Sequence, residues 1–441
     1  MPDAKPIRPL LIAEGANPTL TSASLVGWSC ARAIAQVTDA HIVTEWRNRD
    51  DFLKAGLVEG QDFTAIDIRR IQNLAWRTTK LLSRGEHFSW SLYAIFSNLV
   101  YPFFEREVWK QFAGRLKAGE FDLVHRILPL SPTTPSWISK RLQEIGVPWV
   151  LGPLNGGVPW PQGFDDVRKL ENDGAGRLRA LYRFQPGVHR TRRDARAIIT
   201  GARTTLREMP KELHERCILI PENAIDAKRF DLTPKPPRSP GPLQAAFVGR
   251  LVALKGVDML INAAAPLVRE GKLRLDIIGD GPERERLQNL IHQEGIQSGV
   301  RMEGWVDHSV LQPRLRESDV LAFPSIREFG GGAVLEAMAL GVPPIVLDHG
   351  GPPELVPPST GFVLPLNSRI QIVEDLRGML SRLAQQPEQL VPYSTAAQAH
   401  IRRYYTWEAK ARQIHEVYRW VLGQRPDKPT WGIPMGFESM A

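Results

Sequence analysis

Short apolar runs alternate with helical stretches along the whole chain, and this alternation predicts two α/β domains. In the first half, runs with the composition of strands occupy residues 9–15, 40–46, 121–127, 147–153, 197–202 and 217–223. In the second half, such runs occupy residues 243–249, 273–279, 319–325, 343–348 and 361–365. Strands separated by helices are typical of a mainly parallel, doubly wound sheet, so we expect one Rossmann-like sheet in each half.

A proline-rich segment, residues 231–243, contains almost no core-forming residues and predicts a linker between the two domains. The expected division is an N-terminal domain of residues 1–230 and a second domain of residues 244–400. Near the end of the chain, Thr406 is a candidate N-cap for a helix within residues 401–423, ahead of an irregular tail at 424–441. The apolar face of that helix comprises Trp407, Ala411, Ile414, Tyr418 and Val421.

The composition is that of an ordinary globular protein, with 43% apolar and 24% charged residues in a chain of 441. Its two cysteines, Cys30 and Cys217, stand in no metal-ligand spacing and cannot form a disulfide framework, which favours a reducing cytosol. No apolar stretch has the length of a signal peptide or of a membrane span, so we expect a soluble protein.

The formal net charge is +8, and much of the excess lies in residues 177–207. The simplest interpretation of this segment is a solvated helix face. An anionic lipid surface or an anionic acceptor remains an alternative, whereas nucleic acid is not expected as a partner because no nucleic-acid-binding motif accompanies the charge.

Residues 245–256, AAFVGRLVALKG, place two cations directly after a predicted strand. Ligands of open α/β sheets bind at the carboxyl ends of strands. Arg250 and Lys255 therefore suit the oxygens of a bound phosphate, although taken alone they would be read as surface cations.

Residues 276–287, DIIGDGPERERL, repeat the order of strand, glycine turn and helix. The dinucleotide fingerprint G-x-G-x-x-G would need a glycine where the chain has Arg284. A dehydrogenase is therefore rejected.

The most specific stretch is residues 324–346, in which Glu328 and Glu336 flank the glycines Gly330, Gly331 and Gly332. A glycine run lets backbone approach a ligand, and the N-terminal amides of the helix that follows attract a diphosphate. Glu336 could accept hydrogen bonds from ribose hydroxyls, and Glu328 could reach a sugar. A glycine-proline turn at residues 347–356 is interpreted as a turn, with a wall of a binding cleft as the alternative.

Taken in order, FVGRL with KG, GDGP, GW, E-x7-E with AMA-x-G-x-P, and GG-x-x-E resemble family 4 of the retaining glycosyltransferases, within the glycosyl transferases group 1. The resemblance is strongest over residues 247–364. It implies the GT-B fold, in which two Rossmann-like doubly wound domains face each other across a cleft. The final helix would cross back onto the N-terminal domain.

The resemblance also implies the roles of individual residues. Arg250 and Lys255 would stabilise the leaving diphosphate, Glu328 would bind the donor sugar, and His125 would face the sugar from the N-terminal domain. The base would lie against backbone near residues 304–306. The full set expected to bind the donor is Gly27, Gly249, Arg250, Lys255, Gly279, Trp305, Val306, Glu328, Gly330, Gly331, Gly332, Leu335 and Glu336.

The implied reaction transfers a sugar from a nucleotide diphosphate with retention of configuration, without a metal, a cofactor or a conventional catalytic base. No D-x-D carboxylate pair is present, and Asp165 and Asp166 are adjacent in an unrelated context. Two rival interpretations remain: a nucleotide-sugar epimerase or hydrolase of the same architecture, and an inert nucleotide-sugar-binding protein.

The acceptor would be a glycan or a lipid-linked glycan chosen by the N-terminal domain. Residues 90–112 are rich in aromatic and aliphatic side chains and predict either a buried helical pair or a surface that dips into a membrane. We accordingly expect a cytoplasmic protein, with the inner face of the cytoplasmic membrane as the alternative location.

Overall fold

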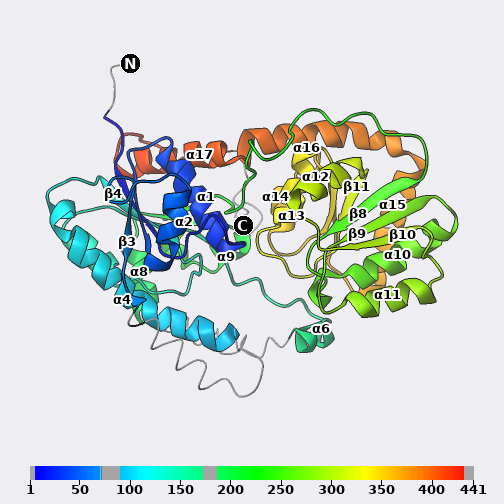
Figure 1. Cartoon of the computed structure of the whole chain (residues 1–441), viewed down its shortest axis with the longest axis horizontal. Coiled ribbons are helices and arrows are strands. Elements are labelled where there is room, and N and C mark those ends of the chain that lie inside the picture. The colour runs from blue at the N-terminus through cyan, green and yellow to red at the C-terminus, as the bar shows by residue number, and fades with distance from the viewer. Residues whose placement is uncertain (1–4, 70, 72–89, 172–185, 432–441) are drawn as a thin grey trace. The chain divides into compact units, whose positions relative to one another are not determined.

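The computed structural model describes residues 5–69, 71, 90–171 and 186–431. These residues divide into two compact units, each built on its own parallel sheet (Figure 1). Unit 1 takes the described residues of Met1–Gly156, Gly174–Glu222 and Lys410–Ala441. Unit 2 takes those of Gly157–Asp173 and Asn223–Ala409.

Unit 1 has a sheet in the order β3-β2-β1-β4-β5-β6-β7, in which every pairing is parallel. Most of its strand residues are fully buried, which accounts for the continuous apolar runs in the sequence. The strands are β1 Pro9–Ala13, β2 His41–Glu45, β3 Phe63–Ile66, β4 Leu123–Leu128, β5 Trp149–Leu154, β6 Ala197–Thr200 and β7 Cys217–Leu219. The helices are α1 Ala23–Ala35, α2 Arg49–Lys54, α4 Trp90–Lys117, α5 Ile138–Glu144, α8 Pro186–Asp194 and α9 Arg203–Arg207, with short 3-10 turns η1 Trp46–Asn48 and η3 Lys211–Arg216.

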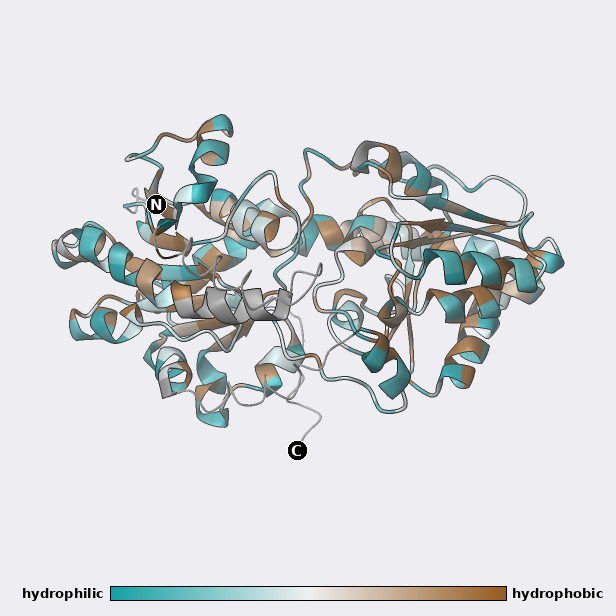
Figure 2. Ribbon diagram, turned by 60° about the horizontal axis from the view of Figure 1, so that its bottom comes forward, coloured by the Kyte–Doolittle hydropathy of each residue, from teal (hydrophilic) through white to brown (hydrophobic). Residues whose placement is uncertain are grey.

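Unit 2 has a parallel sheet in the order β10-β9-β8-β11-β12-β13. Its strands are β8 Leu243–Val248, β9 Leu273–Ile278, β10 Val300–Gly304, β11 Val320–Phe323, β12 Pro344–Leu347 and β13 Phe362–Leu364. Its helices are α6 Asp165–Leu170, α10 Val257–Arg269, α11 Arg284–Gln293, α12 His308–Glu317, α13 Gly332–Ala339, α14 Pro352–Leu355, α15 Arg369–Gln385 and α16 Leu390–Tyr404, with 3-10 turns η4 Ala253–Lys255 and η5 Pro387–Gln389. Figure 2 shows the strands in brown and the helices banded in brown and teal, as expected for helices with one face on the sheet.

The two sheets confirm the prediction of two Rossmann-like domains. Every predicted strand is present, and β3 and β10 are additional. The sequence of β10 is VRMEG. Its charged residues and half-buried positions give it no apolar run, so this edge strand was not predicted. In unit 2 the order of strands reverses between β8 and β11, and ligands of open α/β sheets bind beside such a switch point, beyond the carboxyl ends of the strands.

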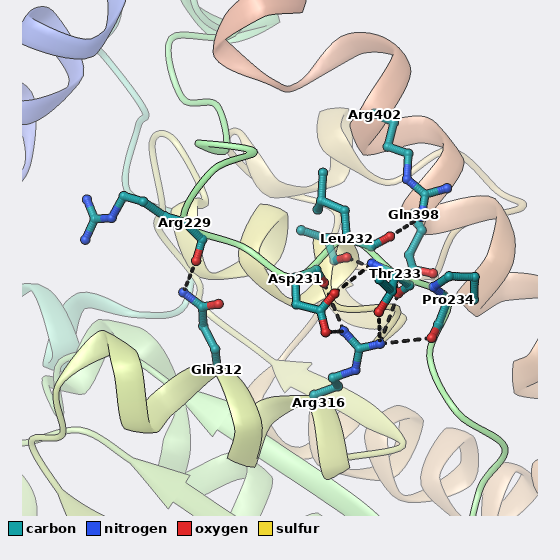
Figure 3. Close-up of polar contacts among 10 residues, drawn as sticks. Arg229, Asp231, Leu232, Thr233, Pro234, Gln312, Arg316, Gln398 and Arg402 are labelled. Atoms are coloured by element: carbon teal, nitrogen blue, oxygen red, sulfur yellow. Dashed lines mark hydrogen bonds and ion pairs between the residues drawn. The ribbon is translucent and has the colours of Figure 1, made fainter.

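The proline-rich segment packs on unit 2 and does not stand apart as a linker. Arg316 of α12 donates to the backbone oxygens of Asp231, Thr233 and Pro234 at 2.9, 3.1 and 2.9 Å (Figure 3). Gln398 of α16 donates to the oxygen of Thr233 at 2.9 Å from another element. Hydrogen bonds to its backbone oxygens hold the segment against unit 2.

The predicted helix within residues 401–423 is α17 Trp407–Val421, and the first residues of that range belong to the end of α16. The break lies at Tyr405 and Thr406, and the Thr406 hydroxyl accepts a hydrogen bond from the Ala409 amide at 3.1 Å, which confirms the predicted N-cap. The division between the units falls within α17, between Ala409 and Lys410.

The aromatic stretch at residues 90–112 is part of α4, whose side chains are described from Val100 onward. Tyr101, Phe104, Val108 and Phe112 are buried in the core of unit 1, whereas Phe103 is 44% exposed. This part of the stretch supports the interpretation of a buried helix. Within the described part of the chain, no helix is both long enough and apolar enough to span a bilayer.

Candidate functional site

The two loops beside the switch point of unit 2 carry Lys255 and Glu328. Lys255 lies in η4 after β8, Glu328 lies after β11, and the Lys255 ammonium contacts the Glu328 carboxylate. The ammonium also lies 4.9 Å from the ring centre of Phe323, the last residue of β11. The structure therefore brings together the cation expected to bind phosphate and the carboxylate expected to bind the sugar.

Backbone contacts between these loops explain why the two side chains meet. The Ile326 amide donates to the Leu254 oxygen at 3.0 Å. Gly256 has a φ of +67°, and a Cβ at this position would lie 2.4 Å from the oxygen of Pro324. A side chain at residue 256 would thus separate the loops.

The loop after β9 supports the β8 loop from its other side. A Cβ at Gly279 would lie 1.9 Å from the oxygen of Gly249, and one at Gly281 would lie 2.3 Å from the oxygen of Leu251. The Leu251 amide donates to the Asp280 oxygen at 2.9 Å. Gly249 and Gly279, both predicted to bind the donor, serve here to let two backbones meet.

The turn at residues 347–356 packs against the loop that carries Glu328. Sequence reasoning did not recognise this role of the turn. The Gly351 amide donates to the Glu328 oxygen at 3.1 Å. A Cβ at Gly350 would lie 2.2 Å from that same oxygen, and one at Gly351 would lie 1.8 Å from the oxygen of Phe329. The paired glycines allow the turn to lie against the backbone of the glutamate loop.

The glycine run ends at the start of α13. Gly331 is the N-cap with a φ of +56°, and α13 begins at Gly332, where a Cβ would meet nothing within 4 Å. The first N–H groups of a helix have no acceptor within it. The first amides of α13 can therefore bind an anion, while Leu335, one turn further, is buried in the core.

Glu336 is half-buried in the second turn of α13. Burial raises its pKa to about 7, and the positive charge of Arg229 opposes this rise. The backbone oxygen of Arg229 accepts a hydrogen bond from Gln312 at 2.9 Å, and Figure 3 shows its side chain extending away from the 231–234 backbone. Arg229 is a charged neighbour of the site that sequence reasoning missed.

Arg250 and Trp305 are the exposed members of the predicted set. The Arg250 side chain has no hydrogen-bond or ion-pair partner among the residues that the structure describes. Trp305 directly follows β10 and is 75% exposed, whereas Val306 is half-buried against the core of unit 2. Both exposed side chains are free to contact a ligand.

His125 does not have the environment predicted for it. It lies in unit 1 on β4, fully buried, with Nε2 2.6 Å from the oxygen of Gly152 and Nδ1 2.5 Å from the hydroxyl of Tyr418. Since a carbonyl only accepts, Nε2 carries the proton and Nδ1 accepts from Tyr418. Burial lowers the pKa of His125 to about 4. Both ring nitrogens are used within unit 1, which gives the side chain a structural role there.

Gly27 is also corrected by the structure. It lies inside α1 rather than in a glycine loop, and a Cβ there would lie 2.3 Å from Cδ1 of Leu128. Its lack of a side chain therefore serves the packing of α1 on the end of β4.

The described residues contain no group of three or more His, Cys, Asp or Glu side chains arranged to hold a metal ion. Asp166, one of the adjacent aspartates noted in the sequence, instead accepts from Arg369 at 3.0 Å.

Comparison with known proteins identifies the C-terminal region. Residues 229–396 match the model of the family described as glycosyl transferases group 1. A similar curated protein, the putative colanic acid biosynthesis glycosyltransferase WcaL of Escherichia coli, is 33% identical over 176 residues, which are 38% of this chain and 41% of WcaL. The alignment thus spans about two-fifths of the relative's length.

Similar solved structures extend over nearly the whole chain. The sucrose-phosphate synthase of Thermosynechococcus elongatus has a TM-score of 0.61 at 17% identity, and the match covers 95% of this chain and 100% of the other. HepE of Anabaena in complex with UDP has a TM-score of 0.60 at 14% identity, over 93% and 99% of the two chains. These likenesses show the fold, which is that of the GT-B glycosyltransferases.

Residues 229–396 are therefore similar to the glycosyl transferases group 1, within a chain that has the GT-B fold. The match agrees with the glycosyl transferases group 1 that the motifs predicted, and the solved structures confirm the predicted fold.

Proposed function

We propose that the protein is a retaining glycosyltransferase of family 4, which transfers a sugar from a nucleotide diphosphate to a glycan or lipid-linked acceptor without a metal. The observation that carries the proposal is the grouping of Lys255, Glu328 and the start of α13 at the switch point of unit 2. This is where an α/β sheet of this order binds nucleotides.

Each part of a nucleotide sugar has a matching group. The diphosphate suits the Lys255 ammonium, the Arg250 guanidinium and the first amides of α13. The ribose hydroxyls suit the carboxylate of Glu336. The base suits the exposed ring of Trp305, because stacking on an aromatic ring tolerates any base.

Departure of the diphosphate develops negative charge, which two cations and helix-terminal amides can stabilise. Each well-placed donor contributes about 3–4 kcal/mol by analogy with oxyanion holes. In this scheme, stabilising the leaving diphosphate needs no metal ion bound by carboxylates. A donor phosphate oxygen would take the acceptor's proton. The similarity to WcaL, which is named for colanic acid biosynthesis, supports a glycan as the acceptor.

The experiment that tests the proposal is a thermal-shift panel of UDP, GDP, ADP and their common sugars, with and without EDTA. We expect one nucleotide to raise the melting temperature, with no effect of EDTA and no shift in Glu336→Ala. Glu285→Ala, which removes an exposed carboxylate of the same unit, should respond like the wild type.

Stabilisation by no nucleotide, in protein shown to be folded, would refute the donor site, and stabilisation abolished by EDTA would refute metal independence. Release of the nucleoside diphosphate only when an acceptor is present would then distinguish a transferase from a hydrolase, an epimerase or an inert binding protein.

A further inference from the structure

Residues 157–171, here called the 157–171 segment, contact three of the loops at the candidate donor site. Arg327 donates from Nε to the oxygen of Val158 at 3.0 Å. His349 Nε2 lies 3.0 Å from the oxygen of Pro159 and donates to it, since a carbonyl only accepts. The Leu254 amide donates to the Glu171 carboxylate at 3.3 Å, although 83 residues separate the two.

The segment is anchored to unit 2 independently of those loops. Phe164 and Val167 are buried in the core of unit 2. Arg369 of α15 contacts Asp166 at 3.0 Å and Asp258 at 2.7 Å, and its guanidinium lies 5.7 Å from the ring centre of Phe164. The segment stands between β5 and α8 of unit 1 in the chain, yet its described residues belong to unit 2.

Of these contacts, the one nearest to Glu328 in the chain is made by Arg327. Its guanidinium lies 4.7 Å from the ring centre of Trp160 and 5.3 Å from that of Phe329. These contacts hold the residues on both sides of Glu328, whose own oxygen is bonded to Gly351. The backbone of Glu328 is thus fixed from the 157–171 segment and from the 347–356 turn.

We propose that Trp160 and Arg327 are positioning residues of the donor site, which hold the Glu328 carboxylate where it binds the donor sugar. The inference rests on the proposed function. Through Trp160, it assigns discrimination of the sugar, but not binding of the nucleotide, to a segment outside the 229–396 family region. Neither residue need touch the donor, because both act through the loop that carries Glu328.

The experiment compares dissociation constants by titration calorimetry for the nucleoside diphosphate selected in the panel and for its nucleotide sugar. Trp160→Ala should raise the Kd of the nucleotide sugar about tenfold, the equivalent of about 1.4 kcal/mol, and that of the nucleoside diphosphate less than about twofold. Trp160→Phe keeps an aromatic face for Arg327 and should remain near the wild type. Leu170→Ala, which truncates a side chain of the same segment that is 65% exposed, is the matched control.

A double-mutant cycle tests the route through Glu328. If Trp160 acts by positioning that carboxylate, Trp160→Ala should have almost no further effect on nucleotide-sugar affinity in a Glu328→Gln background. Additive effects would overturn the inference, as would equal losses of affinity for both ligands or no loss for either. If the wild type binds no nucleotide at all, the proposed function fails and the inference fails with it. If the wild type binds but the variants do not show the predicted effects, only the inference fails.

Discussion

The Lys255 ammonium lies against the Glu328 carboxylate. Lys255 is expected to bind the diphosphate and Glu328 the sugar, and in the structure their two charges neutralise each other. Their side chains are only 16% and 19% exposed, respectively. A pair this sheltered has lost much of its hydration, and removing one partner leaves the other charge partly buried. A diphosphate that takes over Lys255 would release Glu328 to accept hydrogen bonds from the sugar.

We expect Lys255→Ala to weaken nucleoside diphosphate binding at least about tenfold and to lower kcat by about a hundredfold or more, because it removes a cation from the developing charge. Lys272→Ala, which removes an exposed cation paired with Glu270 in the same unit, should change neither constant. Calorimetry and single-turnover kinetics measure the two effects. Unchanged diphosphate affinity in Lys255→Ala would contradict the role given to this lysine.

Donor affinity should depend on pH through Glu336. Burial raises its pKa to about 7, and only the ionised carboxylate accepts hydrogen bonds from both ribose hydroxyls. The affinity should therefore fall as the pH drops below about 7, approaching a tenfold loss per pH unit. The measurement should use a nucleotide sugar, whose diphosphate has no proton to gain near neutral pH. Glu336→Gln should bind weakly with a nearly flat profile, and a profile like that of the wild type would argue against this assignment.

His125 should matter for stability and not for the nucleotide. His125→Ala removes the hydrogen bonds that the buried Tyr418 hydroxyl and Gly152 oxygen make to the ring, at a cost of about 2–4 kcal/mol in the free energy of unfolding. His189→Ala, which removes an exposed histidine of the same unit, should cost little. Urea denaturation gives the stability. An unaltered stability with a large loss of donor affinity would restore the original prediction of a sugar contact.

The same histidine should make the wild type sensitive to acid. Its folded-state pKa of about 4 lies below the ordinary 6.5, so the unfolded state binds more protons between these values. Its contribution to stability is fully present above pH 6.5 and is lost progressively as the pH falls toward 4, with about 2 kcal/mol lost by pH 5. The difference in stability between the wild type and His125→Ala should therefore shrink from pH 7 to pH 5.

Much of the architecture was readable from the chain because it rests on local patterns. Buried parallel strands appear as short continuous apolar runs, and Thr406 stands directly before the apolar face that it caps. The groups of the donor site follow the carboxyl ends of β8 and β11, and the rule that ligands bind at such ends needs only the order of the elements. The resemblance to the glycosyl transferases group 1 followed from the same contiguous motifs.

Other features depended on which distant residues meet. The sequence by itself determined that a histidine lies in an apolar strand and that a glycine precedes Trp28. Packing decided that His125 is buried between Tyr418 and Gly152 and that Gly27 accommodates Leu128. The tertiary structure alone placed residues 157–171 on the loops of unit 2, through contacts that span up to 190 positions in the chain. The physical reason is that periodicity and turn chemistry act between near neighbours, whereas burial, pairing of charges and close backbone approach are set by residues that only folding brings together.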